Sequence, residues 1–148
     1  MNRWICILTI GLLGISGCWS HSGLKPIYPV AMTTPVEVDD VQPTLRWKPA
    51  SESNVTYDVI IYDVIQTQTP LTKPREIGKV VYYREGIKES QHKIEDPLNS
   101  NTEYFWSVRF RSGEKVSPWS TWSYSFYLYG QSIEERNVPF MFKTPEIK

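Results

Sequence analysis

Apolar and polar residues alternate with a period of two along most of this chain, which is the pattern of strands that bury one face. Within Thr56–Ile65 the residues Tyr57, Val59 and Ile61 fall on one face, and Thr102–Arg111 repeats the pattern. In that second segment we expect an inward set of Tyr104, Trp106, Val108 and Phe110. The other predicted strands are Val36–Asp39, Thr44–Lys48, Gly78–Arg84, Gln91–Glu95 and Trp122–Tyr129. Turn residues separate these runs, so the sequence predicts an all-β fold, a single seven-stranded sandwich.

Composition narrows the classes of function. The 148 residues suit one domain with short appendages. Sixteen Lys and Arg balance sixteen Asp and Glu, which argues against a nucleic-acid partner, because domains that bind through bulk charge carry a basic excess. Two cysteines cannot form a disulfide scaffold. Six Trp, nine Tyr and five Phe agree with strands, in which aromatic residues are enriched.

The N-terminus has the order of a secretory signal. Arg3 precedes an uncharged apolar run from Trp4 to Ile15, and small residues follow it. As a helix this run is roughly 18 Å long, too short for a hydrocarbon layer of about 30 Å. We therefore expect residues 1–17 to be a cleaved signal peptide and not a membrane span.

The end of the apolar run is more specific. Ile15-Ser16-Gly17-Cys18 resembles the bacterial lipobox, which implies cleavage before Cys18, a diacylglycerol on its sulfur and often an acyl chain on the new amine. The alternative is that Cys18 is an ordinary residue after a conventional cleavage site. Removal of residues 1–17 also removes Cys6, so no disulfide is expected within the mature chain. Trp19 stands where an aspartate would retain such proteins in an inner membrane, which implies an outer-membrane address in a two-membrane bacterium. Residues 18–34 contain Ser20, Ser22, Gly23, Pro26 and Pro29 without an apolar period, so they are expected to form a lipidated tether.

Residues 35–129 resemble a fibronectin type III domain. Leu45-Arg46-Trp47-Lys48-Pro49 resembles its second strand, with the tryptophan at the centre of the core, and Tyr57-Asp58-Val59 resembles the third. Leu98 to Tyr104 matches the leucine, turn and corner tyrosine, whose hydroxyl returns to an upstream backbone group. Ser117-Pro118-Trp119-Ser120 and then Ser125-Phe126 resemble the last loop and strand. The stretch 66–77 exceeds the usual connection and is a candidate functional loop.

Trp119-Ser120-Thr121-Trp122-Ser123 reproduces the WSxWS pattern of the fibronectin domains of cytokine receptors. In that family the tryptophans interleave with arginines of a neighbouring strand. Here the expected outward set of the preceding strand is Phe105, Ser107, Arg109 and Arg111. The resemblance therefore implies a ladder of Trp119 and Trp122 with Arg109 and Arg111, each stack contributing roughly 0.5–1 kcal/mol. Such a ladder either stiffens one face of the sandwich, the favoured interpretation, or forms a recognition surface.

Catalytic and metal-binding patterns are missing from the sequence. Only His21 and His92 offer imidazoles, and no glycine-rich phosphate loop or G-x-S-x-G motif occurs. We therefore expect that the protein is not an enzyme and holds no cofactor.

The tail 130–148 contains an apolar patch, Pro139–Phe142, which either packs on the sandwich or is a docking peptide.

Two functions remain open from the sequence. One is a lipid-anchored module of the cell envelope that binds or scaffolds another protein. The other is a surface lipoprotein that binds carbohydrate on exposed aromatic rings.

Overall fold

The computed structural model describes residues 5–8, 16–65, 75–128 and 131–147, and the side chains of 18–65, 75–125 and 137–147. Every regular element among these residues is a strand, so the predicted all-β fold is confirmed. The candidate loop 66–77 lies outside the described residues except for its last three positions.

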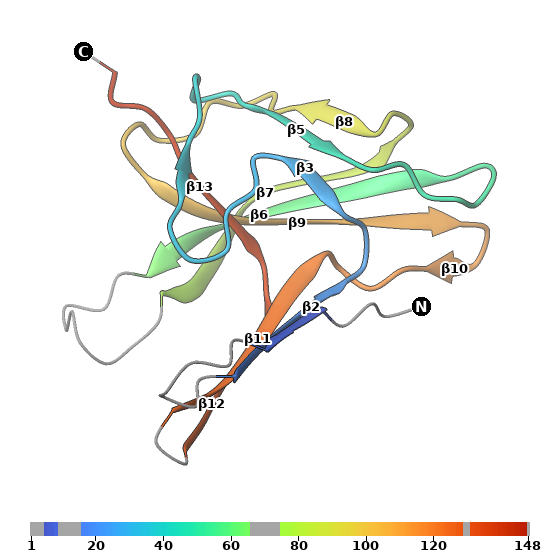
Figure 1. Ribbon diagram of the computed structural model, residues 1–148. Helices are drawn as coiled ribbons and strands as arrows, with labels where there is room; N and C mark the ends of the chain where they lie inside the picture. The colour runs from blue at the N-terminus through green and yellow to red at the C-terminus, as the bar shows by residue number, and fades with distance from the viewer. Residues whose placement is uncertain (1–4, 9–15, 66–74, 129–130, 148) are drawn as a thin grey trace.

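Two sheets face each other across the core (Figure 1). The smaller sheet has the order β3-β5-β8, formed by Pro26–Tyr28, Thr44–Trp47 and Gln91–Lys93. The larger has the order β4-β13-β9-β6-β7, formed by Val36–Glu37, Phe140–Lys143, Glu103–Ser112, Thr56–Ile65 and Glu76–Ile87. The short β10, Lys115–Val116, also pairs with β9. All pairs are antiparallel except β4 with β13.

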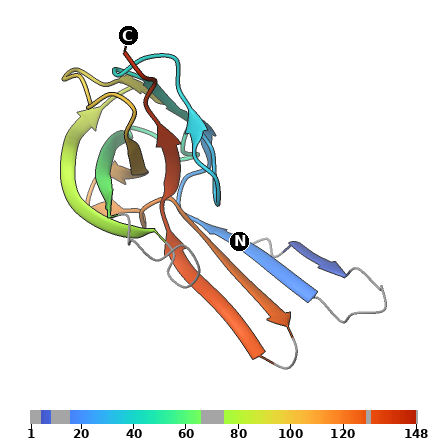
Figure 2. The same ribbon diagram turned by 90° about the vertical axis from the view of Figure 1, so that its left-hand side faces the viewer.

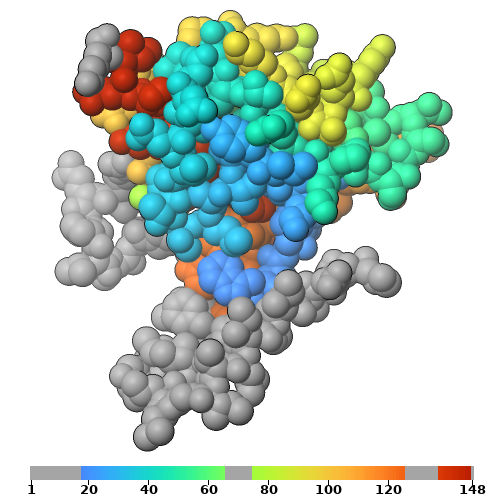
Figure 3. Space-filling view, turned by 45° about the horizontal axis from the view of Figure 1, so that its top comes forward, coloured from blue at the N-terminus to red at the C-terminus, as the bar shows by residue number. Residues whose placement is uncertain are grey.

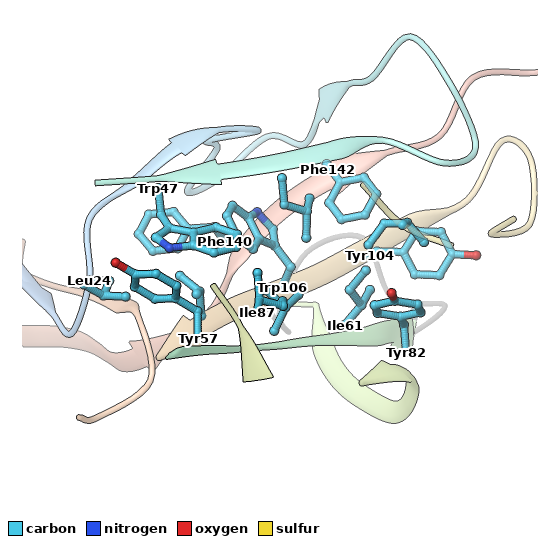
Figure 4. Close-up of a cluster of buried hydrophobic side chains, with 14 of the residues drawn as sticks. Leu24, Trp47, Tyr57, Ile61, Tyr82, Ile87, Tyr104, Trp106, Phe140 and Phe142 are labelled. Atoms are coloured by element: carbon cyan, nitrogen blue, oxygen red, sulfur yellow. The ribbon is translucent and has the colours of Figure 1, made fainter. Parts of the chain in front are cut away.

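The core is aromatic, as the alternation predicts (Figure 4). Trp47 is 1% exposed, and its ring meets Tyr57 edge-on, with the centroids 5.3 Å apart. Tyr104 is also buried, and its hydroxyl oxygen accepts a hydrogen bond from the Asn99 N–H at 3.0 Å. The central tryptophan and the corner tyrosine are therefore where the sequence places them.

Residues 24–31, expected as part of a free tether, lie against the sandwich (Figure 3). Leu24 is buried, and Pro26–Tyr28 forms β3, which pairs with β5. The Trp106 indole N–H donates to the carbonyl of Pro29 at 3.0 Å. This segment is held because it supplies both apolar surface and the acceptor that a buried indole needs.

The last strand of the sandwich is split, which corrects the prediction for Trp122–Tyr129. The first half runs along β9 from Lys115 to Ser120, whose N–H donates to the Val108 carbonyl at 2.8 Å. The chain then leaves β9 and returns as β13, where Phe140 pairs with Trp106. Phe140, Met141 and Phe142 are all buried, so the tail packs on the sandwich, which was one of the two alternatives.

The excursion between the two halves forms an arm that projects from the sandwich (Figure 2). Its hairpin consists of β11, Thr121–Leu128, and β12, Gln131–Val138. The N-terminal strand β2, Ser16–Ser22, pairs with β11, and β1, Ile5–Leu8, pairs with β2. The predicted strand 122–129 thus exists, but in a separate sheet with the order β1-β2-β11-β12.

The outward face of β9 is less exposed than alternation alone predicts. Phe105 and Ser107 were expected outside, yet they are 1% and 2% exposed. Phe105 lies with Trp122 and Met141 around one apolar hollow, and the Ser107 hydroxyl donates to the Ser120 carbonyl at 2.6 Å. The base of the arm covers this part of the face.

Candidate functional site

The segment between β10 and the arm is tied to β9 by serine side chains. The Ser117 hydroxyl accepts the Phe110 N–H at 3.0 Å, and the Ser120 hydroxyl accepts the Val108 N–H at 2.9 Å. Serines three residues apart thus reach the same strand edge. Trp119 stands between them and is held over β9.

Arg109 and Trp119 form the first half of the predicted ladder. The guanidinium carbon of Arg109 lies 4.4 Å from the centroid of the Trp119 ring. The Arg109 Nε also donates to Asp58 Oδ2 at 2.8 Å, and the Arg111 Nε donates to the same oxygen at 2.7 Å. Asp58 is fully buried, and its hydrogen bond and charge raise the pKa of Arg111. The acidic partner fixes the Arg109 plane and therefore the stack.

The second half of the predicted ladder does not form as expected. Trp122 is buried at the base of the arm, where its indole N–H donates to the Pro139 carbonyl at 3.2 Å. Its ring contacts Trp19 and Tyr124, with centroids 5.7 and 5.3 Å away. Arg111 instead pairs with Asp58. Trp122 follows the point at which the chain leaves β9, so it belongs to the arm.

Asp58 is the residue that the sequence analysis missed. Alternation places it on the outer face of its strand, where a carboxylate is ordinarily solvated. In the structure β6 pairs with β9 so that Asp58 lies opposite Arg109. An acidic residue within the apolar run Thr56–Ile65, beside a strand with two outward arginines, was the available signal.

The stack predicts a measurable and selective coupling. A double-mutant cycle with Arg109→Lys and Trp119→Leu, read by chemical denaturation, should give a coupling free energy of about 0.5–1 kcal/mol, because lysine lacks the planar guanidinium. The matched cycle with Arg111→Lys keeps the same acidic partner without the stack, so its coupling with Trp119 should be near zero. Equal couplings in the two cycles would contradict the assignment.

An open groove of about 410 Å³ runs beside Trp119, between the larger sheet and the base of the arm. Its aromatic walls are Trp119 and Tyr62, and burial raises the pKa of the Tyr62 hydroxyl. The other lining residues are Ser22, Ile77, Ser107, Pro118, Thr121, Asn137 and Pro139. No charged side chain lines the groove among the residues that the structure describes. Its size and its mixture of apolar walls and few polar groups are typical of small-molecule sites.

The outer edge of the larger sheet exposes a row of apolar residues. Ile77, Val80, Val81 and Tyr83 of β7 are 38–50% exposed. β7 ends the strand order of this sheet, so its outer backbone edge is unpaired within the described chain. Three register shifts against β6 bend the strand. Bulges of this kind protect an edge against open-ended pairing with other sheets.

Cys18 lies in β2, where it pairs in register with Cys6 of β1 and is disulfide-bonded. Cys6 belongs to residues 1–17, which the lipobox resemblance implies are removed. The expected absence of a disulfide applies to the chain that begins at Cys18. One sulfur can carry the disulfide or a thioether lipid but not both.

The histidines are apart from each other and from the groove. The Tyr82 hydroxyl lies 2.6 Å from His92 Nε2, and burial lowers the pKa of His92. His21 lies in the arm, with its ring centroid 5.7 Å from that of Phe140, and burial lowers its pKa too.

No group of three or more His, Cys, Asp or Glu residues that could hold a metal occurs in the described part of the chain. Nor does any described helix have the length and hydropathy of a membrane span.

Two facing sheets that are mainly antiparallel, a tryptophan at the centre of the core and a corner tyrosine define an immunoglobulin-like domain. The chain belongs to the family of the Rha78A-like, N-terminal immunoglobulin domain, which matches residues 30–126. The fibronectin resemblance is thus shown at the level of the sandwich architecture that the two kinds of domain share. Searches of curated proteins and of solved structures found no match.

Proposed function

We propose that this protein is a lipid-anchored protein of the bacterial cell envelope that acts by binding and not by catalysis. The lipobox pattern ending at Cys18 supports the anchor, and in a two-membrane bacterium Trp19 at the next position favours an outer-membrane address. Two or three acyl chains, at about 0.8 kcal/mol per buried methylene, give an anchor that is stable without a membrane span. The immunoglobulin-like domain supplies a rigid body on that anchor.

The anchor depends on a single atom, the sulfur of Cys18. Cys18→Ser should therefore abolish incorporation of a fatty-acid analogue during growth and shift the protein out of the membrane fraction. Ser20→Ala, two residues further along β2, is the matched control and should keep full labelling. Equal labelling of Cys18→Ser and the parent would refute the lipid anchor.

A protein partner is the leading candidate ligand, and the apolar row on β7 is the observation that carries it. Scattered apolar residues on a surface are ordinary, but four exposed apolar side chains within seven residues of an edge strand are a typical contact site for another protein. The register shifts in β7 favour a discrete partner over polymerisation.

Site-specific photo-crosslinking tests the partner surface in intact cells. A photoreactive phenylalanine at Val80 should give a discrete adduct that disappears when Val81→Glu is added. The same label at Gln91, an exposed position on β8 of the other sheet, should give none. Identical adduct patterns from both positions would contradict a partner site on β7.

Carbohydrate is the second candidate ligand, and the groove beside Trp119 favours it. An aromatic ring held from behind by an arginine, with uncharged hydroxyl and amide groups nearby, suits a neutral sugar. The family match adds support, because the domain is found at the N-terminus of Rha78A-like proteins, which are rhamnosidases. Titration with envelope oligosaccharides should show binding that Trp119→Ala abolishes and Trp19→Ala retains, whereas retention of binding in Trp119→Ala would exclude the groove.

A further inference from the structure

The arm extends beyond the point at which the proposed lipid would be attached. Cys18 of β2 pairs with Ser125 of β11, while Ser22 pairs with Thr121 at the base of the arm. Past Ser125, β11 continues away from the sandwich through Leu128 and pairs with β12. At about 3.4 Å per residue, Leu128 lies about 10 Å further out than Cys18. A bilayer that holds lipid attached to Cys18 therefore meets the outer part of the arm.

Charge is absent from this outer part and begins at the level of the lipid site. The sequence contains no Asp, Glu, Lys or Arg between Lys115 and Glu134. Glu134 pairs with Ser125, which is the residue that Cys18 pairs with on the other side. Beyond that level Phe126, Tyr127 and Leu128 of β11 pair with Ile133, Ser132 and Gln131 of β12. The first carboxylates of the arm thus mark the same level as the lipid attachment site.

Aromatic residues gather next to this level, on the side that faces the sandwich. Trp19 follows Cys18 directly and is 41% exposed; its ring stacks with that of Trp122 and makes a tilted contact with that of Tyr124. Tryptophan and tyrosine are enriched where proteins cross from water into the headgroup region of a bilayer. From the sandwich to the tip, the arm therefore carries an aromatic cluster, a level with carboxylates, and an uncharged end of aromatic, aliphatic and small polar residues.

We propose that the outer part of the arm, β11 beyond Ser125 with its β12 partners, inserts into the interface of the bilayer that holds the lipid on Cys18. This inference rests on the proposed lipid anchor. The depth is limited to the interface, because the open edges of this small sheet carry backbone groups that cannot enter the hydrocarbon core unpaired. Insertion would give the sandwich a fixed orientation above the membrane, which a flexible tether does not.

Environment-sensitive labelling of the lipid-anchored protein tests the inference. Once Cys18 carries lipid, a single introduced cysteine is the only free thiol of the mature chain. We would introduce Leu128→Cys at the end of β11, Ser132→Cys in β12 as a second position, and Glu114→Cys in the exposed β9–β10 turn as the control. Each purified lipoprotein is labelled with a fluorophore and reconstituted into phosphatidylethanolamine–phosphatidylglycerol vesicles that carry a nitroxide on the acyl chains.

We expect blue-shifted emission and several-fold stronger nitroxide quenching for labels at 128 and 132 than for the label at 114, with iodide in the buffer quenching the opposite set. Melting curves close to that of the parent confirm that the labelled arms leave the sandwich folded. Lipidated protein that floats with the vesicles but shows iodide quenching at 128 and 132 overturns the insertion and leaves the anchor intact. Labels shielded from both quenchers also overturn it, since a protein surface and not lipid then covers the arm. Lack of lipid on Cys18 overturns the anchor and the insertion together.

Discussion

Trp47→Ala should destabilise the domain by about 3–5 kcal/mol, a large part of the roughly 5–15 kcal/mol that holds a typical domain folded. Trp47 is 1% exposed and stacks edge-on with Tyr57 at the centre of the core. Its indole nitrogen has no hydrogen-bond partner among the described residues, so the loss arises from packing and the cavity that remains. Chemical denaturation of the variant and the parent measures the difference.

Tyr104→Phe is the graded comparison for this prediction. It removes only the hydroxyl that accepts the Asn99 N–H, so the expected loss is about 1 kcal/mol. A Trp47→Ala protein that melts within a few degrees of the parent, or that loses no more than Tyr104→Phe, would show that Trp47 does not centre the core.

Phe142→Ala should be about as costly as Trp47→Ala, at about 3–5 kcal/mol. Phe142 is fully buried, pairs in register with Tyr104 and packs against its ring at a centroid distance of 5.6 Å. The loss would establish that the C-terminal segment completes the sandwich and is not a docking peptide.

Ile147→Ala provides the matched control in the same tail. Ile147 is 65% exposed, and a surface substitution of this kind ordinarily changes stability by less than about 0.5 kcal/mol. If the unfolding free energies of the two variants agree within that margin, Phe142 lies outside the folding unit.

The ladder shows how far a sequence resemblance extends. Arg109 and Trp119 come together because Trp119 lies in the segment that still runs along β9. Trp122 is only three residues further on, but the chain leaves β9 after Ser120, so Trp122 packs with Trp19 and Tyr124 instead. The spacing of the motif depends only on neighbouring residues. The residue at which the chain leaves β9 depends instead on which distant segment pairs with the rest of that edge of β9.

Burial of Asp58 illustrates the same limit for a single residue. Alternation assigns it correctly to the face opposite Tyr57 and Val59. Its full burial depends on the pairing of β6 with β9, which brings Arg109 and Arg111 over one carboxylate oxygen. Two arginines compensate a charge that would otherwise remain in water.

The sequence by itself determined seven of the strands, since alternation of side chains is a property of consecutive residues. Each of the seven predicted runs overlaps a strand of the structure, whereas β1, β2, β3, β10, β12 and β13 were not predicted. The sequence also determined the central tryptophan and the corner tyrosine, because the resemblance reaches those residues directly. Only the tertiary structure decided that Phe140–Lys143 and not Trp122–Tyr129 completes the sandwich. Both segments have strand-forming patterns, and the choice between them rests on contacts with a distant strand. Phe140 and Phe142 bury their rings in the core beside Trp106 and Tyr104, while residues 121–138 find their backbone partners in the arm and in β2.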